Sequence, residues 1–401
     1  MAQAFSGIRI LDFSQVIAGP YAAQLCNMLG AEVIKIEQPG VGDQMRTLLQ
    51  IDNPAYPDMS PGFISYNSGK RSLAIDLKAP DAHDVIMRLV KQSDVVVQNF
   101  RAGVIDKLGF GYEAIKAVKP DIVYCSISGY GQKGPKAGVP AYDGAVQAAS
   151  GMMSCTGHPE TGPTRVSYLP IDITTGITAA FSIASALFRR SQTGEGQYLD
   201  VAMLDAAVTL QSAHYANFLM GAPEPGLLGN TSPAGLPTAD SFETADGHVL
   251  TSVITEAQVA SMFKVLGLGA MLDDPRFRDN ASRIANREDV LVALRAAFKS
   301  RSSDAWVDEL QAARVPIAKV RSVSEVCADP QMETRGVIAN VPKPGAPERS
   351  MQAVGASFVT NIDGPQVRAA APSIGEHNND VLSELGYSAA EIADLQLGLA
   401  Q

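Results

Sequence analysis

Short runs of β-branched and other apolar residues alternate with longer helical patterns through the first half of the chain. The apolar runs predict six strands, at residues 8–13, 32–37, 72–76, 94–99, 122–128 and 198–203. Between them, apolar positions at helical spacing predict helices at residues 20–29, 80–92, 112–119 and 173–190. Strands that alternate with helices are typical of parallel βαβ units. The pattern therefore predicts an α/β fold whose large, Rossmann-like parallel sheet is covered by helices.

The chain has 401 residues, more than one domain usually contains. Residues 221–237 are rich in glycine and proline and predict a linker, so that residues 1–220 form the N-terminal part of the large domain. A strand after the Asp246-Gly247 turn and three helical patterns predict a small α+β domain at 238–326. We expect a second linker at 327–350. A strand-like run at 351–358 and an acidic closing helix predict that 351–401 complete the large domain.

The charge balance excludes some partners. The chain has 32 Lys and Arg against 42 Asp and Glu, a net charge of -10, and a net-acidic chain without a basic run argues against nucleic acid. An anionic ligand must therefore be met by local basic groups. We expect no membrane partner, because the best candidate, residues 173–188, holds several Thr and Ser and is short for a span.

The cysteines and histidines favour neither disulfides nor metal. The four cysteines are far apart and never in Cys-x-x-Cys, which fits a reducing compartment and buried, unpaired thiols. The five histidines have no metal-ligand spacing. The N-terminus has neither the basic nor the apolar region of a secretory signal. We expect a cytoplasmic protein with no metal site.

The turn after the first predicted strand, residues 12–20, lacks the Gly-x-Gly-x-x-Gly of a dinucleotide site, and there is no Walker loop. An NAD or ATP enzyme is therefore disfavoured, and no tightly bound cofactor is expected. Basic residues do flank the strands, at Lys70-Arg71, Lys78, Arg101 and Lys107. They either converge on a phosphorylated ligand at one edge of the sheet or form a solvated surface.

Asp172 lies between an apolar stretch and a long apolar helical pattern. A carboxylate at a helix N-terminus is stabilised as the anion and often serves only as a cap. An ionised carboxylate in such a place is also able to attack a carbonyl. The residues alone leave both interpretations open.

Several motifs in order resemble the class III CoA-transferase (CaiB/BaiF) family, which includes formyl-CoA and carnitine CoA-transferases. They are Leu11-Asp12-Phe13 with Ala18-Gly19-Pro20, the run from Gly30 to Glu37, Lys70-Arg71-Ser72, Asn99-Phe100-Arg101-Ala102-Gly103, Ser128-Gly129-Tyr130-Gly131, Tyr142-Asp143 and Gly375-Glu376-His377. The resemblance covers nearly the whole chain. It implies a CoA-transferase that takes an acyl-CoA and a free carboxylic acid as substrates, and an interlocked-ring homodimer.

The same resemblance implies roles for individual residues. Asp172 matches the catalytic aspartate, which attacks the donor thioester to give an aspartyl anhydride and then an aspartyl-CoA thioester. The matching CoA-contacting positions are Ile17, Ala18, Ile75, Asp76, Leu77, Lys78, Asn99, Phe100, Arg101, Lys107 and Tyr142. Of these, Lys78, Arg101 and Lys107 would face the CoA phosphates.

Departures from the family pattern bear on the substrate. Formyl-CoA transferase has His and Gln where this chain has Gln15 and Ile17, Arg where it has Gln38, and a four-glycine lid that residues 221–251 lack. These differences favour a larger, more apolar acid than oxalate or formate, and Gln15 remains a candidate partner of Asp172. The related α-methylacyl-CoA racemases need a His where this chain has Tyr142, so racemisation is the less favoured alternative. A CoA-binding protein without turnover, in which Asp172 is only a cap, is the third.

Overall fold

The computed structural model describes residues 3–48, 59–395 and 397–398, which form two compact units. The large unit contains the described residues of Met1–Met152, Val166–Ala222 and Pro330–Gln401. The small unit contains Met153–Arg165 and Pro223–Asp329. Residues 220–240, which include the glycine- and proline-rich stretch, form neither helix nor strand.

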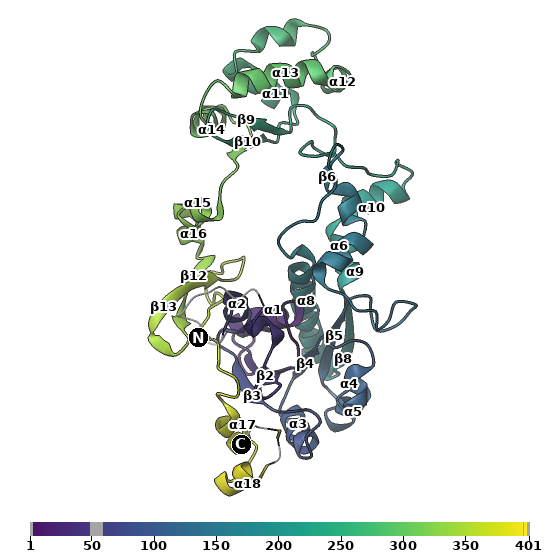
Figure 1. Cartoon of the computed structure of the whole chain (residues 1–401), viewed down its shortest axis with the longest axis vertical. Helices are drawn as coiled ribbons and strands as arrows, with labels where there is room; N and C mark the ends of the chain where they lie inside the picture. Colours follow the sequence, from purple (N-terminus) through teal and green to yellow (C-terminus); the bar gives the residue numbers. More distant parts are fainter. Residues whose placement is uncertain (1–2, 49–58, 396, 399–401) are drawn as a thin grey trace. The chain divides into compact units, whose positions relative to one another are not determined.

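The large unit is built on a parallel sheet of six strands in the order β3-β2-β1-β4-β5-β8 (Figure 1). The strands are β1 (Arg9–Asp12), β2 (Glu32–Glu37), β3 (Arg71–Ala74), β4 (Val95–Gln98), β5 (Val123–Ser128) and β8 (Gln197–Ala202). All six predicted strands are confirmed, with ends that differ by at most two residues. The strand order reverses between β1 and β4. In open parallel sheets such a reversal opens a crevice at the carboxyl ends of the two strands, where ligands bind.

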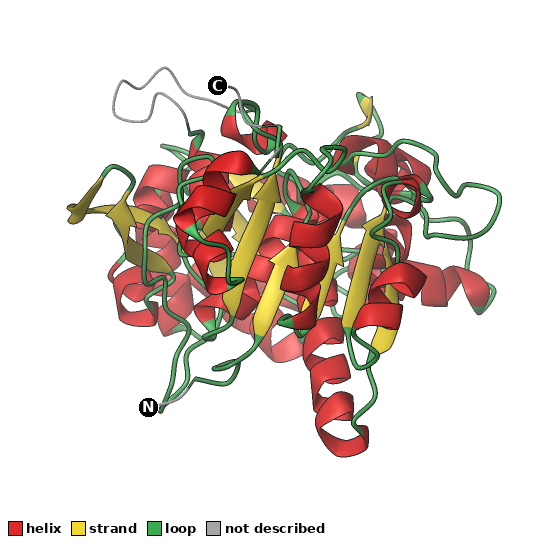
Figure 2. Cartoon of the chain, turned by 90° about the horizontal axis from the view of Figure 1, so that it is seen from below, coloured by secondary structure: helices red, strands yellow, loops and turns green. Residues whose placement is uncertain are grey.

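Helices cover both faces of this sheet, as Figure 2 shows. One face packs against α1 (Ala18–Met28) and α8 (Pro170–Thr193). The other packs against α3 (Ala82–Lys91), α5 (Tyr112–Val118) and α17 (Asn378–Glu384). The remaining helices of this unit are η1 (Gln44–Arg46), α2 (Pro61–Asn67), α4 (Val104–Lys107), α6 (Asp143–Ala149), α9 (Met203–Leu210), α10 (Ser212–Leu219), α16 (Pro330–Arg335) and α18 (Ala389–Asp394).

Helix α8 has 24 residues and begins at Pro170, three residues before the predicted start. Its length and apolar composition would suffice to cross a membrane. Ala179, Ile183, Ala186 and Leu187 pack into the core between the sheet and α1, however, as expected of a core helix. We therefore interpret α8 as one layer of the α/β fold.

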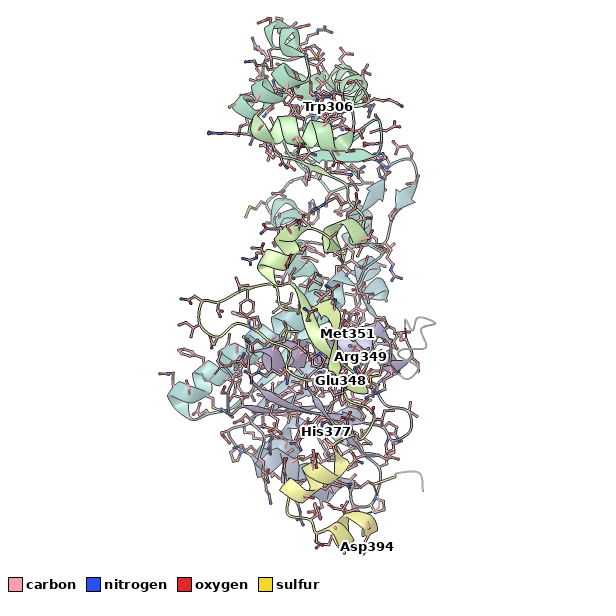
Figure 3. All side chains as sticks on the ribbon, turned by 90° about the vertical axis from the view of Figure 1, so that its left-hand side faces the viewer. Trp306, Glu348, Arg349, Met351, His377 and Asp394 are labelled. Carbon is pink, nitrogen blue, oxygen red and sulfur yellow. The ribbon has the colours of Figure 1, made fainter. Side chains whose placement is uncertain are left out.

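The small unit has a three-stranded antiparallel sheet in the order β11-β10-β9. Its elements are the hairpin β6 (Gly157–His158) and β7 (Gly162–Pro163), β9 (Ser241–Glu243), β10 (His248–Thr251), α11 (Glu256–Val265), η2 (Gly269–Asp273), α12 (Asn280–Ala285), α13 (Arg287–Phe298), α14 (Ser303–Ala312), β11 (Ile317–Lys319) and α15 (Val323–Cys327). Helix α7 (Met152–Cys155) has its first residue in the large unit and the others in the small unit. Trp306, labelled in Figure 3, packs against Phe298 and donates its indole N–H to the Phe298 carbonyl at 2.8 Å. The three helical patterns predicted here are confirmed as α11, α13 and α14.

The C-terminal part differs from its prediction. The expected linker at 327–350 contains α16 and most of a hairpin of β12 (Ile338–Lys343) and β13 (Ala346–Val354), and the strand predicted at 351–358 ends at Val354. The proline and glycine that suggested a linker, Pro344 and Gly345, instead form the two-residue hairpin turn. Gly375 and His377, the latter labelled in Figure 3, donate backbone hydrogen bonds to Ser72, so this segment attaches to the edge strand β3.

The four cysteines are free thiols, but only two are in the core. Cys26 and Cys125 are buried, whereas Cys155 is half-buried and Cys327 is exposed. The expectation that all four act as small buried hydrophobes is therefore wrong for Cys155 and Cys327, which lie at the ends of the short helices α7 and α15.

Candidate active site

A cavity of about 410 Å³ opens where the sheet order reverses, at the ends of β1, β4 and β5. Its lining includes seven of the predicted site residues, namely Ile17, Ala18, Asn99, Phe100, Arg101, Tyr142 and Asp172. Gln15, the candidate partner of Asp172, lines it as well. The structure thus brings together residues from the β1–α1 turn, the end of β4, the loop before α6 and the start of α8.

Asp172 lies in the first turn of α8, and it is not the cap of that helix. The N-cap position is Leu169, which makes no side-chain capping bond. A carboxylate oxygen of Asp143 instead accepts hydrogen bonds from the backbone N–H groups of Ile171, at 2.8 Å, and Asp172, at 3.1 Å. Because Asp143 satisfies these groups, the carboxylate of Asp172 is free to face the cavity. The capping interpretation of Asp172 is therefore wrong.

The environment of Asp172 disfavours its charged form. Burial, and next the negative charge of Asp143, raise the pKa of Asp172 to about 7. The side chain is only 9% exposed, so little water is available to solvate the anion. A carboxylate with such a pKa exchanges between acid and anion near neutral pH, as is common for groups that take part in catalysis.

Asn99 takes up a role that the sequence did not indicate. Its side-chain oxygen accepts the backbone N–H of Gln15 at 2.9 Å, and its side-chain nitrogen donates to the Gln15 carbonyl at 2.7 Å. The two bonds connect the end of β4 to the turn that follows β1. Asn99 therefore shapes the cavity wall through Gln15, in addition to lining the cavity itself.

The basic residues divide into two groups. Arg101 lines the cavity, whereas Lys78 and Lys107 are exposed and lie outside its lining. Lys70 and Arg71 do not converge on it. Lys70 is buried and forms an ion pair with Asp12 at 2.9 Å, and Arg71 pairs with Glu32 and Glu384. Of the two alternatives for the basic residues, the phosphorylated ligand is therefore excluded for Lys70 and Arg71, because their charges are neutralised within the fold.

The predicted stretch from Ile75 to Lys78 follows β3 and does not line the cavity. Ile75 is 1% exposed and belongs to the core beneath α3, and Leu77 packs against the same core. Asp76 accepts the backbone N–H of Lys78 at 3.0 Å in a local turn. Only Lys78 presents an exposed side chain from this stretch.

The sequence does not indicate that Asp143 belongs to the site, although the Tyr142-Asp143 motif is part of the family resemblance. Nor does it indicate the loop at residues 138–140, which lines the cavity. One signal was available in Gly129, where a Cβ atom would lie 2.3 Å from that of Ala141. Only glycine allows the two loops to approach so closely. Within the part of the chain that the structure describes, no three His, Cys, Asp or Glu side chains gather as metal ligands.

The family model described as CoA-transferase family III matches residues 5–378. The chain belongs to this family. It is 33% identical to the succinate–glutarate CoA-transferase of Agrobacterium fabrum, over 95% of both chains. It is also 33% identical to the acetyl-CoA:oxalate CoA-transferase of Acetobacter aceti, covering 96% of this chain and 97% of that one.

A crystal structure of a CaiB/BaiF family protein from Brucella suis resembles this fold with a TM-score of 0.86 and 30% identity, covering 96% of this chain and all of the other. The resemblance seen in the sequence is thus confirmed. The protein is an enzyme of the CoA-transferase type, and its substrates are CoA thioesters. Racemisation is not favoured, since the curated relatives are named as transferases.

Proposed function

We propose that this CoA-transferase moves CoA from an acyl-CoA to a free carboxylic acid through covalent intermediates on Asp172. The observation that carries the proposal is the position of the Asp172 carboxylate, which lines the cavity and is relieved of helix capping by Asp143. Its pKa of about 7 makes the anion available at neutral pH. Its burial limits the access of water, which would hydrolyse an anhydride.

The proposed chemistry has two halves. A carboxylate oxygen of Asp172 attacks the thioester carbonyl, the C–S bond breaks, and CoA leaves as a thiolate from an aspartyl–acyl anhydride. The thiolate attacks the aspartyl carbonyl, giving an aspartyl-CoA thioester and the free donor acid. The acceptor carboxylate then attacks that thioester, which releases the CoA thiolate and forms a second anhydride. The thiolate attacks the acceptor's acyl carbon in this anhydride, which gives the new acyl-CoA and returns Asp172 as the carboxylate. A hard exchange is divided into easier steps, and the thioester bond is conserved.

We assign CoA to the cavity walls at Ile17, Ala18, Asn99, Phe100, Arg101 and Tyr142. Arg101 is the cationic residue of the lining, and Lys78 and Lys107 present exposed ammonium groups outside it. This arrangement supports a pantetheine end at the cavity and phosphates near the exposed lysines. Ile75 and Leu77 would act only through the backbone of their turn, because both side chains pack into the core, and the Asp76 carboxylate would act by holding the Lys78 N–H in that turn.

For the acceptor we propose a carboxylic acid larger than oxalate. Ile17 is an apolar, buried part of the cavity wall, and it offers no hydrogen bond to a second carboxylate held close to the nucleophile. The Agrobacterium relative is named for succinate and glutarate, acids of this larger size. The Acetobacter relative is named for oxalate, so the family alone does not decide the acid.

We also propose a cytoplasmic homodimer of interlocked rings. Phe181 and Phe188, on α8, are 73% and 70% exposed, and large apolar side chains left on one face of a helix are typical of an interface. The four free thiols suit a reducing compartment. Light scattering after size exclusion would give twice the chain mass of 42.3 kDa for a dimer, and a single chain mass would contradict it.

The transfer reaction itself is tested with pairs of substrates. Wild type and Asp172→Ala are incubated with an acyl-CoA and a second acid, and the formation of the new acyl-CoA is followed. We expect exchange only when both substrates and Asp172 are present. Hydrolysis of the acyl-CoA without exchange, or exchange by the Ala variant above a few per cent, would contradict the proposal.

A further inference from the structure

The turn between β1 and α1 contains a strained residue at the cavity wall. Val16 has a φ of 70°, and in the described part of the chain the only other non-glycine residue with positive φ is Arg314. A β-branched side chain is rare in this left-handed region, where ordinary residues cost about 1–2 kcal/mol. Val16 lines the cavity that also contains Asp172. Such strain persists only where surrounding contacts impose it.

Asp43 supplies one of these contacts. Its Oδ1 atom accepts the backbone N–H groups of Val16 and Met45, each at 2.9 Å. Its Oδ2 atom lies 2.8 Å from the ammonium of Lys35, and both side chains are buried. Burial alone would lower the pKa of Lys35, but Asp43, Asp12 and Glu37 outweigh it and raise that pKa, so Lys35 is charged at neutral pH.

Lys35 and Asn99 hold the rest of the turn. The ammonium of Lys35 donates to the Ser14 carbonyl at 2.7 Å, and Asn99 binds both backbone polar groups of Gln15. The N–H of Ser14 is taken by Asp12 at 2.9 Å. Every backbone polar group from the Ser14 N–H to the Val16 N–H therefore has a side-chain partner. These partners come from the ends of β1 and β4, from within β2 and from the loop after β2.

Close contacts carry this geometry to the first turns of α8. A Cβ atom on Gly19 would lie 2.2 Å from that of Ser14, so the turn folds directly onto the start of α1. A Cβ atom on Gly176 would lie 2.9 Å from the carbonyl oxygen of Ala18. Gly176 is one helical turn beyond Asp172. The start of α1 thus touches α8 next to the proposed nucleophile, and a shift of the turn at Val16 would alter the wall of its cavity.

We infer that Asp43, paired with Lys35, is a positioning residue that holds Val16 in its left-handed conformation and so sets the cavity wall from Gln15 to Ala18 beside Asp172. Asp43 does not line the cavity, so it acts through the turn and not on the substrate. The inference deepens the proposed transfer reaction and rests on it for its catalytic readout.

The test is a rescue by glycine, which adopts positive φ without a steric penalty. Asp43→Asn removes the ion pair with Lys35 that orients this side chain, so its remaining oxygen is no longer held against the N–H groups of Val16 and Met45. We expect kcat for transfer to fall at least about tenfold, equivalent to roughly 1.4 kcal/mol. Val16→Gly alone gives the reference kcat for the double variant, because Val16 itself lines the cavity. The double variant should recover most of the lost kcat, since the turn no longer needs Asp43 to impose its conformation.

Asp94→Asn is the matched control. Asp94 also accepts a backbone N–H, from Arg9 at 2.8 Å, and pairs with Arg190 at 2.8 Å, but it precedes β4, at the amino ends of the strands and outside the cavity lining. It should leave kcat unchanged even if it lowers the melting temperature. Unchanged kcat in Asp43→Asn, or a double variant no faster than Asp43→Asn, would overturn the inference.

Two further arms keep the result decisive. If Asp43→Asn does not fold, the combined variant Asp43→Asn with Lys35→Met removes the ion pair without leaving an unpaired buried charge, and Val16→Gly must rescue its kcat; a loss that is not rescued would overturn the inference. Calorimetric binding of CoA is measured in parallel. If wild type transfers CoA between no substrate pair, the proposed function fails, and the inference then requires that Asp43→Asn weaken CoA binding and that Val16→Gly restore it.

Discussion

The carboxylate of Asp143 accepts a hydrogen bond from the backbone N–H of Asp172 at 3.1 Å. The two acids therefore divide two tasks that one aspartate at a helix start would otherwise have to combine. Asp143 accepts the N–H groups at the start of α8, while Asp172 lines the cavity as the proposed nucleophile. The proximity of the two negative charges also contributes to the raised pKa of Asp172.

The first prediction concerns this pair. Asp143→Asn retains an oxygen that accepts the α8 N–H groups but removes the charge, so the pKa of Asp172 should fall below its present value of about 7. Because the anion is the proposed nucleophile, we expect kcat/KM of wild type to rise with pH through that pKa. The rise should move to lower pH in the variant. A pH profile that coincides with that of wild type would show that Asp143 has no electrostatic effect.

The second prediction concerns stability. The folded pKa of Asp172, about 7, lies above its ordinary value of 3.8, so the folded protein holds this proton more tightly than the unfolded chain does. As pH rises from about 4 to about 7, ionisation of Asp172 therefore lowers the free energy of unfolding, and the loss is complete above pH 7. Asp172→Asn removes this loss. The free energy of unfolding of Asp172→Asn minus that of wild type should therefore increase between pH 4 and pH 8, by on the order of 2–4 kcal/mol.

Urea unfolding of both proteins at pH 4, 6 and 8 measures that difference. Asp200→Asn is a suitable comparison, because Asp200 is an exposed strand carboxylate that accepts the N–H of Gln132. A difference between Asp172→Asn and wild type that is constant across the three pH values would contradict the raised pKa.

The third prediction concerns the exposed lysines. Lys78→Ala and Lys107→Ala should each raise the KM for acyl-CoA about three- to tenfold with little change in kcat, because their proposed phosphate contacts are remote from the bond that breaks. The effect should shrink as salt is added. Lys119, which pairs with Asp121 at 3.1 Å and lies outside the cavity lining, provides the control substitution. If KM is unaffected in both variants, the phosphates bind elsewhere.

The fourth prediction concerns the acid. Ile17→Gln places a hydrogen-bonding amide in the apolar wall beside Asp172, and it should favour a short dicarboxylate over a longer one. With oxalate and glutarate as competing acceptors, the ratio of their kcat/KM values should shift toward oxalate by about tenfold. Ile17→Leu keeps the wall apolar and should leave the ratio unchanged. An unchanged ratio in Ile17→Gln would remove Ile17 from the acid site.

The parallel sheet was predictable because its strands are short apolar runs that stand out between helical patterns. The run at 95–97, Val-Val-Val, is fully buried as β4, where both faces are covered by helices. The hairpin of β12 and β13 carries no such signal, because most of its residues are half-buried or exposed. A hairpin without a buried face shows no alternation of apolar and polar residues, so Pro344-Gly345 indicates part of a linker at 327–350 and not a turn.

The site was predictable only where the family resemblance points to a residue, as with Asp172, which lines the cavity although its sequence position alone fits a helix cap equally well. It was not predictable where tertiary contacts decide the role. Asp143 caps α8 from 28 residues away in the chain, and Lys70 is neutralised by Asp12, which is 58 residues away. No local pattern distinguishes such residues from solvated ones. The positive φ of Val16 is likewise hidden, since valine ordinarily indicates a strand and not a left-handed turn.

Mass spectrometry of trapped intermediates tests the central claim most directly. Wild type and Asp172→Ala are each incubated with a panel of acyl-CoAs, treated with hydroxylamine, digested and sequenced. The account predicts a hydroxamate at Asp172 in wild type and none in the variant, because both the anhydride and the aspartyl-CoA thioester are open to hydroxylamine. Steady transfer by wild type with no modified Asp172, or with the hydroxamate on another residue, would contradict it.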